Sequence, residues 1–374
     1  MVLLIAITIS NGLHYDYHDY SDDIGFIDAF HKYGILGGTR FMLNDCNGRL
    51  VSHLLAVWLL PFVTLSNALL VIFYLGNGVL FVAAISWFLK QFFAYRYSVQ
   101  LSNGNAVIAG CVFYSLFFFF FFAKRFEFWF WLSDVFIYEY SLILILFLTG
   151  ILLRGDAENK ARLPIILLSI CIGFMSETQA ATQLLILGFL VIDRWRGWGE
   201  TIKQGKWKLV SVAIITTALL VNYYAPGTAH KLKISKTHVT GATNYAHGLT
   251  VLAKDLTLNW DRIKINGTNP VFINALSVQA ICAFLLFLLL KSFVDRRLHY
   301  THQQLPIKGF IPVIFGATLI VLMTYLVPAI LYANVLDFVV DRCKLIGCFF
   351  IFVAFFDMTI MFAIFLRKGG RNSA

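Results

Sequence analysis

Apolar stretches long enough to cross a lipid bilayer follow one another along most of this chain, and they limit its fold more than any other feature. A helix needs about 20 apolar residues to span the hydrocarbon core of a bilayer. Lipid offers the backbone no hydrogen-bond partners, so runs of this length without strict alternation favour helices over a β-barrel. The sequence therefore predicts an all-α, polytopic integral membrane protein.

Composition and charge agree with that prediction. Hydrophobic residues make up 59% of the 374 residues and charged residues only 13%, and the mean hydropathy is +0.76. A water-soluble protein of this composition would expose large apolar patches. The net charge of +10 comes with Lys and Arg gathered in the short loops between apolar runs, which is the positive-inside bias. We therefore expect membrane lipids as partners and no nucleic acid.

We expect about nine to eleven transmembrane helices in a single domain that covers residues 1–374. The first apolar run has about half the length that a span needs. A Gly-Asn-Gly sequence at 76–78 is expected to interrupt the apolar region after it. The runs are residues 2–13, 50–74, 78–97, 106–122, 138–153, 163–192, 209–225, 271–290, 310–332 and 345–366.

The run at 163–192 is too long for one typical helix and contains the polar sequence Ser176-Glu177-Thr178-Gln179. One tilted helix and a hairpin of two short helices both fit this pattern. The hairpin is preferred because it keeps all of the basic segments on the inner face, and residues 50–97 then make a single net crossing. Those basic segments are residues 154–162, 193–208, 291–308 and 367–371.

Alternation between the two faces then gives two large outer loops. The first covers residues 14–50, and we expect a surface helix at 24–33 within it. The second covers residues 226–270, and the segment at 334–342 lies on the same face. The fold is thus expected to combine a transmembrane bundle with a long first outer loop.

Within the first outer loop, Ser21-Asp22-Asp23 is the main candidate for chemistry. Adjacent carboxylates near hydrocarbon repel each other and resist desolvation, so one of them suits a general base that deprotonates a hydroxyl nucleophile. The alternative is structural, because Ser and Asp are favoured helix N-caps and carboxylates suit a first turn. Upstream, His14 and His18 are spaced to share a helix face and could bind a metal, but intervening Tyr residues also indicate an interfacial aromatic belt.

Cationic residues follow the end of another predicted helix. Asn222 opens a segment in which Pro226 and Gly227 stop the helix, and His230 and Lys231 come next on the outer face. Cations on the outer face are contrary to the positive-inside bias, and they suit binding of a phosphate anion. The alternative is that lysines extend their side chains to the membrane interface.

Four further residues stand out because they place charge or flat rings at the membrane. Glu177 lies within an apolar run, so it is a functional candidate with Lys231 or Arg49 as its partner, or else a carboxylate paired only for packing. Arg342 follows Asp341 at an outer helix end, where a local salt bridge is the alternative. Trp131 and Tyr138 suit the face of a sugar, although an interfacial belt is the preferred interpretation.

The order of these features resembles the GT-C superfamily of polytopic glycosyltransferases, and more closely the uncharacterised bacterial membrane families related to it. The shared features are a short first span, an outer loop that opens with Asp-Asp and closes with Asn-Gly-Arg, an aromatic patch, a break at Ser176-Glu177, the Asn-x-x-Ala-Pro-Gly segment from Asn222 followed by a base, and a late outer Arg.

The resemblance implies a multi-pass enzyme of the bacterial cytoplasmic (inner) membrane that uses a sugar donor carried on a polyprenyl phosphate or diphosphate, with a glycan or lipid as acceptor. It implies that Asp22 or Asp23 acts as the base or helps to bind a divalent cation, the candidate cofactor. By the same resemblance Arg49, Lys231 and Arg342 hold the lipid phosphate, and Glu177, His230, Asn222, Trp131 and Tyr138 line the substrate site.

The expected reaction is an inverting sugar transfer at the outer face, with a deprotonated acceptor hydroxyl attacking the anomeric carbon. The alternative function is a flippase or transporter of a lipid-linked or anionic solute. The two functions differ in where they need charge, because a transporter predicts functional charge near the bilayer midplane rather than at one face.

Overall fold

Every regular element in the described part of the chain is a helix, which confirms the all-α prediction. The computed structural model describes residues 2–14, 21–46, 48–97, 99–120, 132–154, 161–192, 198–228, 349–350, 352–354 and 356–360. The helices are α1 (Val2–His14), α2 (Ser21–Asp45), α3 (Leu50–Val63), α4 (Asn67–Tyr97), α5 (Asn103–Phe120), α7 (Leu132–Asp134), the π-helix η3 (Val135–Glu139), α8 (Tyr140–Leu153), α9 (Arg162–Met175), α10 (Glu177–Ile192) and α11 (Trp198–Tyr223).

Two helices of the described residues are long and apolar enough to cross a membrane. One is α4, and the other is the continuous helix Leu132–Leu153, formed by α7, η3 and α8. The predicted runs at 271–290 and 310–332 lie outside the described residues, so the expected total of spans stays a prediction.

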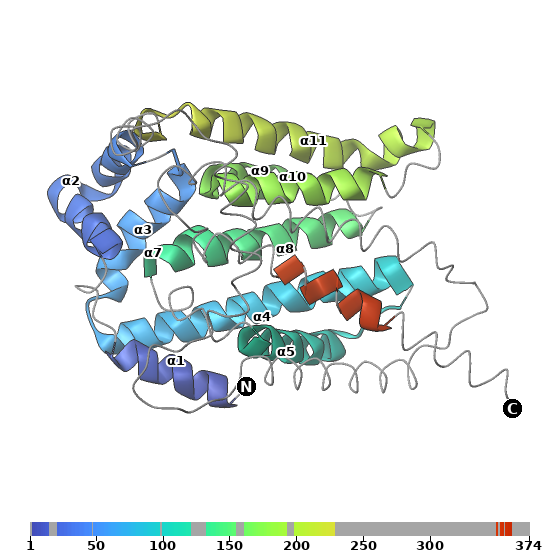
Figure 1. Cartoon of the computed structure of the whole chain (residues 1–374), viewed down its shortest axis with the longest axis horizontal. Coiled ribbons are helices and arrows are strands. Elements are labelled where there is room, and N and C mark those ends of the chain that lie inside the picture. The colour runs from blue at the N-terminus through green and yellow to red at the C-terminus, as the bar shows by residue number, and fades with distance from the viewer. Residues whose placement is uncertain are drawn as a thin grey trace, which may run out of the picture.

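The long helices lie side by side in a row, with Leu132–Leu153 in the middle (Figure 1). On one side of it come α9 and α10, covered by α11, and on the other side come α4 and then α1 and α5. Leu142, Ile145 and Leu148 of the central helix are all fully buried. A helix that is apolar around its whole circumference belongs in such a position.

Aromatic side chains attach the late chain segment to the bundle. Phe113 of α5 packs against Phe352 with ring centroids 4.8 Å apart in an edge-to-face arrangement, and the described residues between 349 and 360, red in Figure 1, lie near α4 and α5. Each such pair contributes about 0.5–1.5 kcal/mol beyond its buried area. At the end of α4, Arg96 pairs with the Asp357 carboxylate at 3.5 Å, and the Tyr97 hydroxyl donates a hydrogen bond to the same group.

The expected interruption at 76–78 is wrong, because α4 runs unbroken through it. Asn77 is buried, and its Oδ1 accepts a hydrogen bond of 2.8 Å from the Tyr140 hydroxyl, so this residue joins two helices instead of forming a turn. The chain turns earlier, between α3 and α4, where Pro61 weakens the last turn of α3. Ser66 then caps α4 by accepting the Leu69 N–H at 3.3 Å.

The run at 163–192 consists of two helices, as preferred from the sequence. Ser176 separates α9 from α10 with an extended backbone (φ −157°, ψ 145°), and both helices contact α11 and each other. Glu177 stands in the first turn of α10, where a carboxylate is favoured by the helix dipole.

The helix expected at 24–33 is part of the longer helix α2, which packs along α3. Gly34 kinks α2 with φ 68° and ψ −174°. Residues with a side chain avoid this positive φ, so glycine is needed at the kink. The assignment of residues 14–50 and 226–270 to outer loops stays a prediction.

Candidate functional site

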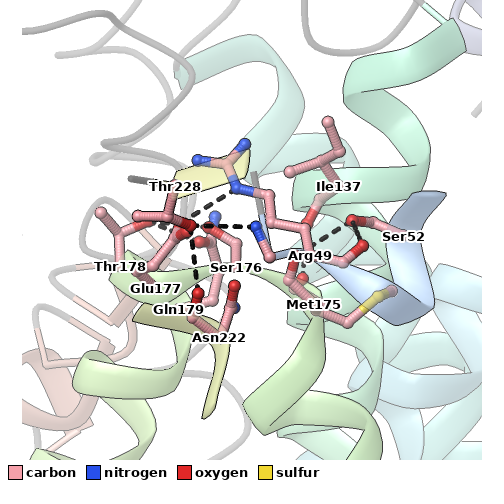
Figure 2. A network of polar contacts seen from close by, with 12 residues as sticks. Arg49, Ser52, Ile137, Met175, Ser176, Glu177, Thr178, Gln179, Asn222 and Thr228 are labelled. Atoms are coloured by element: carbon pink, nitrogen blue, oxygen red, sulfur yellow. Dashed lines mark hydrogen bonds and ion pairs between the residues drawn. The ribbon is translucent and has the colours of Figure 1, made fainter. Parts of the chain in front are cut away.

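Polar segments from distant parts of the chain meet at one end of the helix row. They are the start of α3, the break between α9 and α10, and the end of α11 (Figure 2). The start of the central helix belongs to the same end, because its π-helix packs on α3 and Ile137 lies beside Arg49 and Ser52. We call this region the polar end.

An ion pair between Arg49 and Glu177 is the main charged contact of the polar end. Nε of Arg49 donates to Oε2 of Glu177 at 3.0 Å, and the two side chains are 8% and 16% exposed. Of the two partners proposed for Glu177 from the sequence, Arg49 is thereby confirmed. Loss of either member would remove an ion pair from a largely buried position, which is destabilising.

Gly48 brings the α3 entry into close contact with the end of α11. Its N–H donates to Oγ1 of Thr228 at 3.1 Å, and that hydroxyl donates to the Asn222 carbonyl at 3.0 Å. A Cβ atom on Gly48 would lie 2.2 Å from the same carbonyl oxygen. Only glycine therefore fits at this position. Through its two hydrogen bonds, the Thr228 hydroxyl bridges the Asn-Gly-Arg sequence and the Asn222 segment.

The side chain of Asn222 is fully buried beside this contact. Neither its Oδ1 nor its Nδ2 has a hydrogen-bond partner among the described residues. A buried amide without partners costs about 1–3 kcal/mol. Both the donor and the acceptor of this amide are therefore unused by the described residues.

Ser52 ties the first turn of α3 to the end of α9. Its hydroxyl donates to the Met175 carbonyl at 3.0 Å, and the Arg49 carbonyl lies 3.2 Å from the same Oγ. The last carbonyls of a helix have no partner within the helix, so Ser52 satisfies one of them. This contact supports the break at Ser176 that places Glu177 opposite Arg49.

The two adjacent aspartates of α2 have different environments. Asp23 is fully buried, and its Oδ1 accepts the Ser133 N–H at 2.9 Å. Ser133 lies in the first turn of the central helix, where backbone N–H groups have no partner within the helix. Asp23 satisfies one of them, and its negative charge interacts favourably with the helix dipole. Asp22 is exposed. Both aspartates lie in the first turn of α2, as the structural alternative expects. Asp23, however, bonds to the start of a different helix, while Asp22 lies at the surface.

The remaining predicted site residues divide into two groups. Tyr138 is described and buried within the π-helix, so its ring offers little surface to a ligand. Trp131, His230, Lys231 and Arg342 lie outside the described residues. The expected meeting of Asp22 and Asp23 with Lys231 and Arg342 therefore stays a prediction.

A metal role also stays a prediction. Within the described residues no group of at least three His, Cys, Asp and Glu side chains could hold a metal ion. His14 ends α1 exposed, with Nδ1 2.7 Å from the Ser10 carbonyl, and His18 lies outside the described residues.

Sequence reasoning missed the roles of Gly48, Ser52 and Ser133 in the polar end. Gly48 carried a signal, because Asn-Gly pairs mark sharp changes of direction. Ser52 and Ser133 carried none. A serine hydroxyl in an apolar run, such as that of Ser52, bonds to its own helix as readily as to another, and Ser133 contributes a backbone N–H, which any residue except proline carries.

Comparison of the chain with protein-family models, with curated proteins and with solved structures gives no match. The resemblance to the GT-C superfamily therefore depends on the order of sequence features alone.

Proposed function

We propose that this chain is a multi-pass glycosyltransferase of the bacterial cytoplasmic membrane. It would move a sugar from a polyprenyl-phosphate-type lipid to a glycan or lipid acceptor at the outer face. The observation that carries the proposal is the gathering of Arg49, Glu177 and the partnerless amide of Asn222 at one end of the helices. A transferase needs its polar groups together at one membrane surface, where lipid donor and polar acceptor meet.

In the proposed reaction Asp22 removes the proton of an acceptor hydroxyl. The resulting oxygen attacks the anomeric carbon, the bond from that carbon to the lipid phosphate oxygen breaks, and the phosphate leaves with the bonding electrons. Arg49 supplies positive charge toward the leaving phosphate, with Lys231 and Arg342 proposed beside it. Asp23 acts as a positioning residue, because it holds the start of the central helix through Ser133.

Glu177 has a distinct part in this proposal. It holds Nε of Arg49 at 3.0 Å and so orients the guanidinium group before the donor arrives. The buried amide of Asn222 is suited to a sugar hydroxyl, which both donates and accepts hydrogen bonds. A divalent cation bound with the help of Asp22 is a further part of the proposal.

The test compares carboxylates of the same helix in membranes supplied with a labelled sugar on polyprenyl phosphate. Asp22→Asn should lower the transfer rate by about 100-fold or more, as expected for loss of a general base. Asp28→Asn removes an equally exposed carboxylate of α2 and should leave the rate unchanged. Transfer by Asp22→Asn at the wild-type rate would contradict the catalytic assignment.

A carrier of a lipid-linked or anionic solute is the second candidate, and one observation favours it. Glu139 is buried within the central helix, away from the helix end that holds Arg49, and a transporter needs charge at such a depth. Reconstituted vesicles distinguish the two functions. A carrier moves labelled lipid-linked sugar across the bilayer unchanged, whereas a transferase releases the sugar to an acceptor.

A further inference from the structure

A small hollow lies among α1, α4, α5 and the π-helix, apart from the polar end. Its lining includes Thr8 of α1, Tyr74 and Asn77 of α4, Tyr114 of α5, and Glu139 at the end of the π-helix. The space inside is about what one water molecule needs. Nearly every polar atom that lines it is a neutral oxygen or an amide, and Glu139 supplies the one formal charge among the lining residues.

Glu139 is 3% exposed, yet no described residue donates a hydrogen bond to its carboxylate or forms an ion pair with it. The neighbouring Asn77 uses Oδ1 to accept from the Tyr140 hydroxyl at 2.8 Å, while its Nδ2 has no partner among the described residues. A buried carboxylate that lacks a partner needs an explanation in a ligand or an ion, whereas the Asn77 amide nitrogen is a donor and does not itself bind a cation. Both of these groups belong to the same hollow.

The π-helix explains how a carboxylate comes to face this space. In a π-helix the hydrogen bonds run from residue i to i+5, so the turn is wider than in the α-helix on either side. Val135–Glu139 forms such a turn, with Glu139 as its last residue before α8 begins. Single π-turns inside α-helices occur frequently at functional sites.

The charge of the Glu139 carboxylate determines the charge of an ion that the hollow could bind. An isolated carboxylate in apolar surroundings is costly, so it has to be neutralised by one positive charge. A divalent ion would leave one charge in excess, since the titratable neighbours on the surrounding elements are the neutral phenols of Tyr74, Tyr114 and Tyr140. Hydroxyl, amide and carboxylate oxygens are ligands for hard cations.

We propose that the Glu139 hollow binds one monovalent cation, either a proton or Na⁺. The cation is held by the Glu139 carboxylate and by the hydroxyl and amide oxygens around it. This proposal does not depend on the transferase activity, and it would make the central helix sensitive to the ion composition of the medium.

The experiment uses the purified full-length chain in detergent, at constant ionic strength with choline replacing Na⁺. Infrared difference spectra follow the carbonyl band of a protonated carboxyl group as pH is raised, and thermal unfolding is followed as Na⁺ is added. If the ion is a proton, the band disappears on raising pH and Na⁺ has no effect. If the ion is Na⁺, its addition raises the unfolding temperature by about 2–4 °C and removes the band.

Glu139→Gln should abolish the band change and the Na⁺ effect, while Asp28→Asn, which removes an exposed carboxylate, should keep both. The wild-type spectra do not depend on whether a variant folds, and Asn77→Ala, which leaves Glu139 in place, should weaken the Na⁺ response or shift the band. The proposal is overturned if the wild-type chain shows neither a titrating carboxyl band nor a response to Na⁺. It is equally overturned if Glu139→Gln retains the wild-type behaviour.

Discussion

Glu177 and Glu139 are both carboxylates in largely apolar surroundings, but their neighbours differ. Glu177 begins a helix and has the Arg49 guanidinium 3.0 Å away, whereas Glu139 lies inside a continuous helix with no ion-pair partner among the described residues. The first carboxylate is neutralised by the protein itself. The second needs a cation from the medium. A glutamate therefore stabilises the fold in one region and forms the proposed cation site in the other.

The largest effect is expected from separating the Arg49–Glu177 pair. Glu177→Gln or Arg49→Met should lower the free energy of unfolding by about 3 kcal/mol, because each removes the 3.0 Å ion pair from a largely buried charge. Denaturant titration of the purified chain measures this. The double variant Arg49→Met with Glu177→Leu should recover most of the loss. Single variants as stable as the wild type would show that the pair contributes nothing.

The next effect concerns the close approach of Gly48 to α11. Gly48→Ala should destabilise the chain by about 1–3 kcal/mol, since a Cβ there overlaps the Asn222 carbonyl. Gly25→Ala is the matched control on α2, where a Cβ meets nothing within 4 Å, and it should stabilise the helix by about 0.5–1 kcal/mol. Thermal unfolding of the two variants gives the comparison, and equal shifts would contradict the packing described at Gly48.

A smaller effect is expected from removing the hydrogen bond between Tyr140 and Asn77 beside the Glu139 hollow. Tyr140→Phe removes the hydrogen bond to Asn77 Oδ1 and should cost about 1 kcal/mol of stability. Tyr223→Phe offers a control at an exposed tyrosine of α11. A larger loss for the control would show that the hydroxyl of Tyr140 has no special part in joining α4 to the central helix.

The smallest effect sharpens the contrast between the two carboxylates. Glu139→Gln makes the same chemical change as Glu177→Gln but breaks no ion pair, so in medium without Na⁺ it should change the free energy of unfolding by less than about 1 kcal/mol. Measuring both variants side by side in denaturant removes common errors. A loss at Glu139 as large as that at Glu177 would mean that its carboxylate has a partner in the folded chain.

The sequence predicted the helical class well, because apolar length is a local property that each segment displays. It also located the break at Ser176, where polar residues interrupt an apolar run. It misplaced the turn before α4, since Gly76-Asn77-Gly78 has the composition of a turn, and the hydrogen bond that Asn77 accepts from Tyr140 cannot be seen in the local sequence.

Long-range partners limited what could be predicted of the candidate site. Arg49 was one of two partners considered for Glu177, but the partner of Asp23 is a backbone N–H 110 positions away, and no side-chain pattern reveals such a contact. Glu139 did carry a signal that sequence reasoning overlooked, because an acidic residue inside an apolar run of this length is unusual.

The hydrogen bond from Gly48 to Thr228 joins residues 180 positions apart. During synthesis the first helices therefore leave the ribosome long before the segment that completes their polar end exists. Closing such a long loop carries an entropic penalty, and contacts of this kind form late. Until α11 and Thr228 have been made, the α3 entry lacks part of the contacts it has in the folded chain, so the polar end stays incomplete for much of synthesis.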